Sequence, residues 1–253
     1  MLDEIISSTH RRITVLKDRG GEDSPRRGVT GRFETALARP GLAVIGEIKR
    51  RSPSRGVLAE GLDPVRQARI YEGAGAAAVS VLTEPDHFGG SNHDLTRVAE
   101  AVGIPVLRKD FTLDPAQVWE AAGIGADAVL LIVAILDDRR LGELLEVSAE
   151  AGLAALVEVH NAQEARRAVR AGAGIVGVNN RDLRNFTVDL GTSLHLAPML
   201  ADAKIRIAES GIHTPAQAAE MAAAGFDAVL VGEALVRARS PGDLVSQMRE
   251  AVG

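Results

Sequence analysis

The chain has 253 residues and a formal net charge of −5, with 46% hydrophobic and only 3% aromatic residues. This length is compatible with one α/β domain or two smaller ones. The lack of cysteine excludes disulfides, cysteine-bound metal sites and thiol catalysis. The acidic balance argues against a nucleic-acid partner, and no apolar run approaches the roughly 20 residues that span a bilayer. The acidic N-terminus is unlike a signal peptide, so we expect a cytoplasmic protein that acts on a small molecule.

The first forty residues stand apart from the rest of the chain. Apolar residues from Leu2 to Leu16 recur at helical spacing and predict an amphipathic helix. Residues 19–28 are polar and contain Gly, Pro and Ser, so we expect a flexible loop there, followed by a short helix over residues 33–38. We interpret residues 1–40 as a helical extension. It either plugs the bottom of the following domain or forms a lid over its active mouth, and the sequence leaves both open.

Residues 41–253 repeat one unit. Short runs of Val, Ile, Leu and Ala alternate with helical segments, and the runs lack the polar alternation of a one-sided sheet. Such a pattern is typical of parallel strands covered on both faces. The predicted strands are residues 43–48, 77–82, 104–107, 128–133, 154–159, 175–178, 205–208 and 228–231. Eight strand–helix repeats predict a single closed (β/α)8 TIM barrel, with an open doubly wound sheet as the alternative.

Local signals support this order of elements. Asp63-Pro64, Asp114-Pro115 and Thr214-Pro215 each place a capping side chain before a proline, which is typical of a helix start. Residues 172–177 match the G-x-G-x-x-G dinucleotide pattern. A nucleotide-binding loop of that kind follows a strand and opens a helix, whereas these glycines end a predicted helix and enter a strand. We therefore expect no nucleotide cofactor here.

Ionisable and amide side chains gather at the carboxyl ends of the predicted strands, the face that carries the chemistry in barrel enzymes. By contrast, strand beginnings such as Leu42-Ala43 are apolar. A charge directly after a buried run is costly unless it is paired, so a ring of structural ion pairs is the plain alternative to an active site. Together these groups can bind an anion, donate one proton and accept another. They are Glu47, Lys49, Lys109, Glu158, Asn179, Arg181 and Glu209.

A phosphate site is predicted at the same mouth. Ser210-Gly211 follows the seventh strand and Gly232-Glu233 the eighth, and barrels often bind phosphate with backbone N–H groups of these two loops. Residues 52–56, after the first strand, offer further hydroxyl and N–H donors. Ordinary tight turns are the alternative for each. The six histidines show no metal-ligand spacing, so we expect no metal.

In their order along the chain, these residues resemble one family, indole-3-glycerol-phosphate synthase of tryptophan biosynthesis. The resemblance spans about residues 42–236, and the ordered set is specific although each motif alone is modest. The motifs are Glu47-Ile48-Lys49-Arg50-Arg51-Ser52-Pro53-Ser54, Thr83-Glu84, Phe88-Gly89-Gly90-Ser91, Pro105-Val106-Leu107-Arg108-Lys109-Asp110-Phe111, Leu156-Val157-Glu158-Val159-His160, Gly177-Val178-Asn179-Asn180-Arg181-Asp182-Leu183, Ala208-Glu209-Ser210-Gly211-Ile212 and Val229-Leu230-Val231-Gly232-Glu233.

The resemblance implies a lyase reaction. The substrate would be 1-(2-carboxyphenylamino)-1-deoxyribulose 5-phosphate, and the products indole-3-glycerol phosphate, carbon dioxide and water, with no organic cofactor. Lys109 would be the general acid in ring closure and Glu158 the acid/base partner in dehydration. Lys49 would hold the substrate carboxylate, and Glu47 would orient Lys49. Which lysine delivers the first proton stays open.

The remaining implied roles concern substrate binding. Asn179, Arg181 and Glu209 would shape and polarise the pocket, and His160 would add a substrate contact. Phe111 and Leu130 would press on the aromatic ring. The phosphate would be surrounded by Ser52, Ser210, Gly211, Gly232 and Glu233. We expect a monomer or weak homo-oligomer.

Three other functions compete with this one. A Schiff-base barrel aldolase would use Lys49 or Lys109 as an uncharged amine, which the neighbouring glutamates disfavour. The isomerase of the same pathway relies on a cysteine, which is absent here. A non-catalytic paralogue that binds a phosphorylated ligand should have lost acid/base residues, and this chain retains those of the family motifs.

Overall fold

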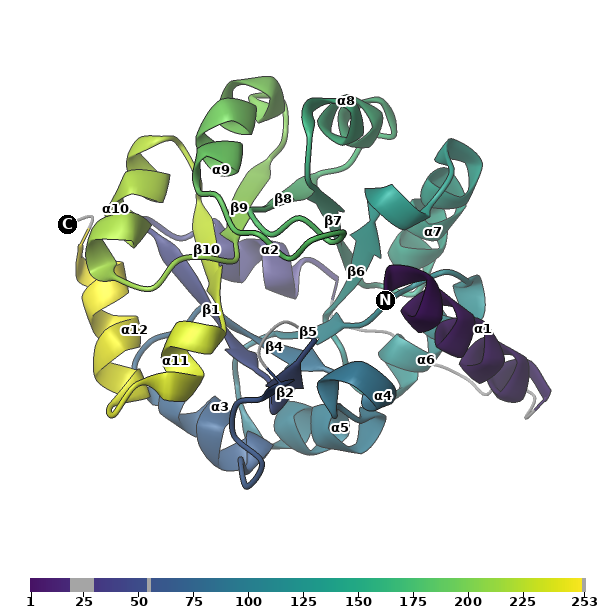
Figure 1. The fold of residues 1–253 in the computed structure, drawn as a ribbon, viewed down its shortest axis with the longest axis horizontal. Helices are drawn as coiled ribbons and strands as arrows, with labels where there is room; N and C mark the ends of the chain where they lie inside the picture. The colour runs from purple at the N-terminus through teal and green to yellow at the C-terminus, as the bar shows by residue number, and fades with distance from the viewer. Residues whose placement is uncertain (19–29, 54–55, 252–253) are drawn as a thin grey trace.

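The computed structural model describes residues 1–18, 30–53 and 56–251. Within these ranges, eight parallel strands close into a barrel in the order β1-β10-β9-β8-β7-β6-β5-β4 (Figure 1). The barrel strands are β1 Ala43–Ile48, β4 Ala78–Leu82, β5 Val106–Lys109, β6 Ala128–Ile132, β7 Ala154–Val159, β8 Ile175–Asn179, β9 Ile205–Glu209 and β10 Ala228–Val231. Because β1 pairs with both β10 and β4, the barrel sheet has no open edge. The predicted TIM barrel is confirmed, and the doubly wound sheet was the wrong alternative.

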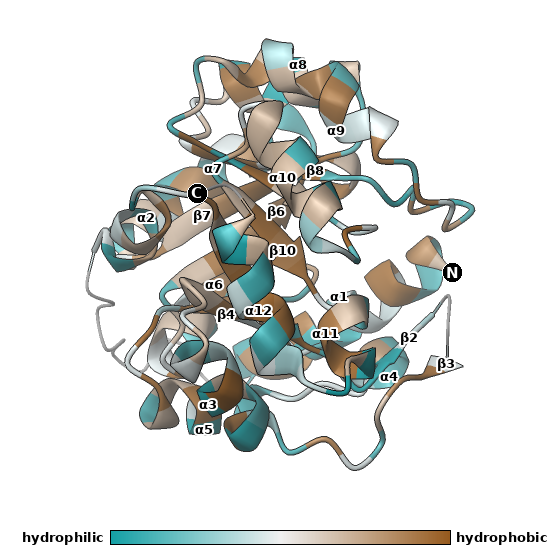
Figure 2. Ribbon diagram, turned by 90° about the vertical axis from the view of Figure 1, so that its left-hand side faces the viewer, coloured by the Kyte–Doolittle hydropathy of each residue, from teal (hydrophilic) through white to brown (hydrophobic). Residues whose placement is uncertain are grey.

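Helices surround the barrel and connect successive strands (Figure 1). The main connecting helices are α3 Pro64–Gly73, α5 Asn92–Ala101, α6 Pro115–Gly123, α7 Asp138–Glu150, α8 Ala162–Arg170, α9 Gly191–Leu196 and α10 Pro215–Ala223, and α12 Pro241–Glu250 follows the last strand. Shorter elements sit in the loops: β2 Arg51–Ser52, β3 Gly56–Val57, α4 Pro85–Phe88, α11 Glu233–Arg237 and the 3-10 helices η1 Val133–Ile135 and η2 Ala197–Leu200. Figure 2 shows apolar residues along the strands and polar ones on the outer helices, as a barrel buried on both faces requires.

The predicted helix signals take their expected places. The Asp63 and Thr214 side chains accept backbone N–H groups at the starts of α3 and α10, and Pro64 and Pro215 occupy the first turn. Asp114 does the same for α6. Gly172, with φ of 78°, follows α8, and Gly177 lies within β8, so residues 172–177 do not form a nucleotide-binding turn.

Strand boundaries differ most at β5. The sequence predicts a strand over residues 104–107, whereas the structure places β5 at Val106–Lys109. Side chains alternate along a strand, so Lys109 faces the barrel and Arg108 faces the surrounding helices. The Arg108 guanidinium there donates to Glu120 at 2.6 Å and to the carbonyl oxygen of Gln117 at 2.8 Å. A charged residue can therefore lie within a buried strand when its partners are built into the next helix.

The barrel interior is filled in layers. One layer is entirely apolar and comes from alternate strands: Ile45, Leu107, Leu156 and Ile207, each with no exposed surface. The residue two positions later in each of these strands points to the same side. Those residues are Glu47, Lys109, Glu158 and Glu209. A layer of ionisable groups thus rests directly on a fully apolar one.

The N-terminal extension reaches both ends of the barrel. Helix α1, Leu2–Asp18, packs near α6 and α4 (Figure 1), and its Arg12 pairs with Asp110, just beyond the carboxyl end of β5. Helix α2, Arg32–Leu37, lies at the opposite end, where Arg32 pairs with Asp127 before β6. The extension was expected either to plug the bottom of the barrel or to form a lid over its mouth. In the structure α2 lies at the bottom and α1 lies at the rim of the mouth. The predicted loop over residues 19–28 lies outside the described residues.

Candidate active site

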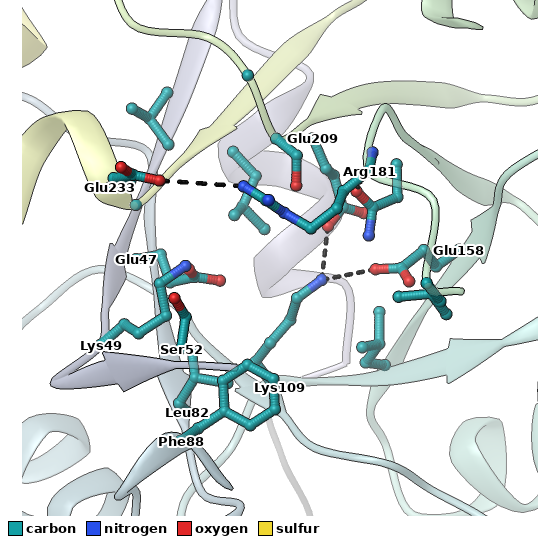
Figure 3. Close-up of a pocket in the computed structure, with 18 of the residues that line it drawn as sticks. Glu47, Lys49, Ser52, Leu82, Phe88, Lys109, Glu158, Arg181, Glu209 and Glu233 are labelled. Carbon is teal, nitrogen blue, oxygen red and sulfur yellow. Dashed lines mark hydrogen bonds and ion pairs between the residues drawn. The ribbon is translucent and has the colours of Figure 1, made fainter. Parts of the chain in front are cut away.

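Lys109 lies at the centre of the charged layer, held between two carboxylates. Its Nζ is 2.8 Å from Glu158 Oε2 and 2.6 Å from Glu209 Oε2 (Figure 3). The side chains of Glu158 and Glu209 are each 2% exposed, and that of Lys109 is 12% exposed. The three groups come from β5, β7 and β9, alternate strands that direct them into one space.

Their surroundings separate the two carboxylates. Burial alone would raise the pKa of Glu158, but the Lys109 ammonium and His160 hold it well below its usual value. Burial, aided by the charge of Glu158, raises the pKa of Glu209 to about 7 even though Lys109 opposes the shift. Burial disfavours the ammonium of Lys109, yet Glu158 and Glu209 raise its pKa. Near neutral pH the cluster thus holds one firm carboxylate, one ammonium and one carboxyl group close to its titration point.

Glu47 and Lys49 form a second pair at the end of β1. Lys49 Nζ lies 2.5 Å from Glu47 Oε1, as expected for residues on the same face of an extended segment. Gly232 provides the space for this pair. A Cβ atom at Gly232 would lie 2.4 Å from Glu47 Oε1 and 3.2 Å from Lys49 Nζ.

One wall of the pocket is apolar. Phe111 and Leu130 line it as predicted, and the Phe111 ring lies 6.2 Å from that of Phe88 between centroids. Leu183 and Phe186, from the loop after β8, also line the pocket. Leu183 belongs to one of the family motifs, but the sequence predicts a site role for neither residue. The sequence does contain a signal for them: both are apolar residues within five positions of Arg181, in a segment that follows a predicted strand.

The loops after β9 and β10 lie where the phosphate was expected. Ser210 and Gly211 both have left-handed backbones, with φ of 65° and 80°. Gly232 precedes α11, so Glu233 occupies the first position of that short helix. The Glu233 carboxylate lies 4.0 Å from the Arg181 guanidinium across the pocket (Figure 3) and 3.4 Å from that of Arg237. The carboxylate of Glu233 therefore has cationic neighbours beside the expected phosphate position.

All but one of the predicted site residues line a single pocket. Those residues are Glu47, Lys49, Ser52, Lys109, Phe111, Leu130, Glu158, Asn179, Arg181, Glu209, Ser210, Gly211, Gly232 and Glu233. His160 does not line this pocket. It directly follows β7, and its ring lies 3.3 Å from Glu158. Ser54 and Arg55 lie outside the described residues. The charged groups are paired, as expected if they formed only a ring of structural ion pairs. They also face an open pocket with an apolar wall, as expected of a binding site.

The described part of the chain lacks a metal-binding cluster and a membrane-spanning helix. It holds no cluster of three or more His, Asp or Glu side chains able to bind a metal ion. No helix within it is both long and apolar enough to cross a membrane.

Comparison with known proteins identifies the family. The sequence profile described as "Indole-3-glycerol phosphate synthase" matches residues 3–248. The chain belongs to this family. A synthase of that name from Kineococcus radiotolerans is 48% identical over 98% of this chain and 86% of its own length. One from Parafrankia sp. is 55% identical over 84% of this chain and 79% of its own, and one from Lactiplantibacillus plantarum is 43% identical over 100% and 99%.

Solved structures with similar folds are more distant in sequence. A 3-hexulose-6-phosphate synthase has a TM-score of 0.68 at 16% identity, and the match covers 84% of this chain and 100% of that structure's chain. The α subunit of tryptophan synthase from Legionella pneumophila has a TM-score of 0.63 at 17% identity, with 87% and 98% covered. At these identities the likeness concerns the barrel fold alone.

Proposed function

We propose that this protein is an active indole-3-glycerol phosphate synthase. It converts 1-(2-carboxyphenylamino)-1-deoxyribulose 5-phosphate to indole-3-glycerol phosphate, carbon dioxide and water. The observation that carries the proposal is Lys109, an ammonium group fixed between Glu158 and Glu209 beneath a pocket with one apolar wall. The reaction needs an acid beside a carbonyl, a base for dehydration and an apolar surface for an aromatic ring.

Each part of the substrate has a matching region of the pocket. The aromatic ring packs against Phe111 and Leu130, and its carboxylate lies toward the Lys49 ammonium. The phosphate lies against the Ser210-Gly211 turn and the backbone before α11, where N–H groups bind anions. Binding at both ends bends a flexible chain so that the ring carbon approaches the ketone, which removes much of the entropic barrier to ring closure.

Ring closure uses Lys109 as the acid. The ring carbon that bears the carboxylate attacks the ketone carbon, and the Lys109 ammonium protonates the ketone oxygen to a hydroxyl group. Carbon dioxide then leaves, and its bonding electrons restore the aromatic ring. Glu158 and Glu209 hold Lys109 at hydrogen-bond distance and stabilise its charge before the step.

Dehydration uses Glu158 as the base. The hydroxyl group takes a proton from Glu209 and leaves as water, and Glu158 accepts the proton lost from the adjacent carbon. Glu158 then passes this proton to the Lys109 amine, and Glu209 takes up one proton from solvent, which restores the starting charges. The low pKa of Glu158 keeps it ionised before ring closure. Once Lys109 has given up its proton, the charge that lowers this pKa is gone and Glu158 becomes a stronger base, while the pKa of Glu209 near 7 allows it to donate. Asn179 and Arg181 complete the polar side of the pocket.

The Schiff-base alternative requires a free amine. The two carboxylates beside Lys109 raise its pKa and keep it an ammonium, which cannot attack a carbonyl. Borohydride trapping with a ketose phosphate separates the two reactions: we expect no covalent adduct.

The direct test is an assay of the purified protein with the carboxyphenylamino-deoxyribulose phosphate. We expect indole fluorescence to appear and one carbon dioxide to be released per product, without added metal or cofactor. Absence of product over a broad range of pH and substrate concentration would contradict the proposed function. Location in the cytoplasm and a monomeric or weakly associating state stay predictions; size-exclusion chromatography with light scattering checks the latter.

A further inference from the structure

We propose that His160 is a positioning residue that acts through Glu158: a protonated imidazole that fixes the orientation of this base and keeps it ionised. The inference rests on the proposed function and replaces the expected substrate contact. It assigns to His160 a role in the charge state of the site, without direct contact with the reacting atoms.

The geometry places His160 between two carboxylates. Its Nε2 lies 3.3 Å from Glu158 Oε1, and its Nδ1 lies 3.0 Å from Glu164 Oε2. The backbone N–H of His160 also donates to Glu164 Oε2, at 2.8 Å. The His160 side chain is 11% exposed and lies outside the residues that line the pocket. The ring is therefore placed to act on Glu158 and Glu164 and not on a bound substrate.

This arrangement favours the charged ring. A neutral imidazole has one N–H group and can donate to only one of two carboxylates, whereas an imidazolium donates from both nitrogens. The ionisable groups that face the ring are Glu158 from β7 and Glu164 from α8, and both are acidic. Although burial opposes the charge, these two neighbours raise the pKa of His160 to about 10.

Glu164 is itself fixed by the start of helix α8. Its backbone N–H donates to the Asn161 side chain at 3.0 Å, and the Asn161 amide donates back to Glu164 Oε1 at 2.6 Å. Helix capping thus directs Glu164 toward the end of β7, where His160 lies. The residues from His160 to Glu164 form one local unit that sets the position of the imidazole.

His160 also explains why the two carboxylates beside Lys109 differ. Glu158 has a cation near each oxygen: the Lys109 ammonium donates a hydrogen bond to Oε2, and His160 Nε2 lies at ion-pair distance, 3.3 Å, from Oε1 without forming a hydrogen bond. Glu209 has Lys109 at Oε2, while its buried Oε1 finds no hydrogen-bond partner among the residues that the structure describes. The second cation attracts the Oε1 end of Glu158 and favours its ionised form. Glu158 therefore acts as the base, and Glu209 is left free to carry a proton.

Steady-state kinetics of His160→Gln test this role, with His195→Gln, a change at an exposed histidine of α9, as the control. We expect kcat to fall about tenfold, part of the 10²–10⁴ that a placed acid or base supplies, and KM to change less than about twofold. Loss of the cation raises the pKa of Glu158, so the acidic limb of the kcat profile shifts to higher pH. A raised KM with an unshifted profile would restore the substrate-contact interpretation, and unchanged kinetics would overturn the proposal.

Nitrogen NMR of the histidine rings tests the charge without relying on activity. The His160 signals are those that disappear in His160→Gln. We expect both ring nitrogens to be protonated at pH 8 in the wild type. In Glu164→Gln, the pKa of His160 falls and the ring loses its proton at a lower pH. A neutral His160 ring in the wild type at pH 8 would overturn the proposal, whereas an inactive wild type with a charged ring would contradict the proposed function alone.

Discussion

The two ends of the barrel use the same residue types in different ways. At the bottom, the Asp127 carboxylate accepts from the Arg32 guanidinium at 3.0 Å and from the backbone N–H of Val106 at 2.8 Å. Asp227 similarly accepts from the backbone N–H of Arg206 at 2.8 Å. At the mouth, Glu158 and Glu209 hold the side chain of Lys109. The bottom carboxylates tie strands together, whereas those at the mouth hold an ammonium group beside the pocket.

This contrast shows how structural ion pairs can be told from catalytic ones. A carboxylate that binds backbone N–H groups fixes the chain and gains little from changing its charge. A carboxylate whose partners are ionisable side chains, beside an open pocket, can exchange protons with a substrate. The strand beginnings are also less uniformly apolar than the sequence suggests, because Asp127 and Asp227 directly precede β6 and β10.

The largest effect is expected for Lys109→Met, which removes the proton donor. We predict that kcat falls by about 10²–10⁴, the usual contribution of a placed acid, while the protein stays folded. The exposed Lys204→Met serves as the control. Indole fluorescence under saturating substrate gives kcat. A Lys109→Met enzyme with nearly full rate would place the acid elsewhere and break the contrast between the two ends.

A smaller effect is expected for Gly232→Ala, which tests the Glu47–Lys49 pair. The added Cβ would lie 2.4 Å from Glu47 Oε1, so the carboxylate must move and Lys49 with it. Misplacing a binding group by about an ångström can cost about 10²-fold, and we expect a loss of kcat/KM of roughly tenfold to that value. At Gly174, the nearest atom to an added Cβ is Lys204 Cδ at 3.9 Å, so Gly174→Ala is the matched control. Equal activity of the two variants would contradict the account.

Glu209→Gln is predicted to trade activity for stability. The folded-state pKa of Glu209, about 7, is above its usual 4.5, so burying its charge costs stability above pH 7 and costs nothing below pH 4.5. We therefore expect the variant to gain stability relative to wild type as pH rises from 5 to 8, by about 1–3 kcal/mol, and to lose kcat. Urea unfolding at the two pH values measures this. A gain that is the same at both would show that the charge is not its cause.

How much the sequence could predict depends on the type of feature. The strand pattern placed Glu47, Lys109, Glu158 and Glu209 at the mouth of the barrel, because each lies at or just beyond the carboxyl end of a predicted strand. It could not show which charges pair, because Lys109 meets Glu158 and Glu209 only after the barrel closes. The position of His160 escaped for the same reason, since its environment depends on how α8 packs beside β7. Leu183 and Phe186 belong to a loop whose path has no sequence period.

The smallest effect is expected for Arg12→Ala, which removes the contact between α1 and the mouth. Arg12 donates to Asp110 at 2.9 and 3.0 Å, next to both Lys109 and Phe111. We expect a loss of about 1–3 kcal/mol of unfolding free energy, because the buried Asp110 loses one of its two charged partners and keeps only Arg108 at 3.6 Å, and only a few-fold loss of kcat/KM. Lys17→Ala, at an exposed pair with Asp114, is the control, with an expected change within about 1 kcal/mol. A kcat loss as large as that of Lys109→Met would make α1 part of the catalytic machinery.

The most direct test of the contrast compares Glu158→Gln at the mouth with Asp127→Asn at the bottom, each measured for kcat and for unfolding free energy. For Glu158→Gln we predict a kcat loss of at least about 10²-fold in a folded protein. For Asp127→Asn we predict a loss of about 1–2 kcal/mol in unfolding free energy, with kcat unchanged within about twofold. If folded Asp127→Asn loses kcat as strongly as Glu158→Gln, or if Glu158→Gln keeps nearly full rate, the division of the barrel into a catalytic mouth and a structural bottom is wrong.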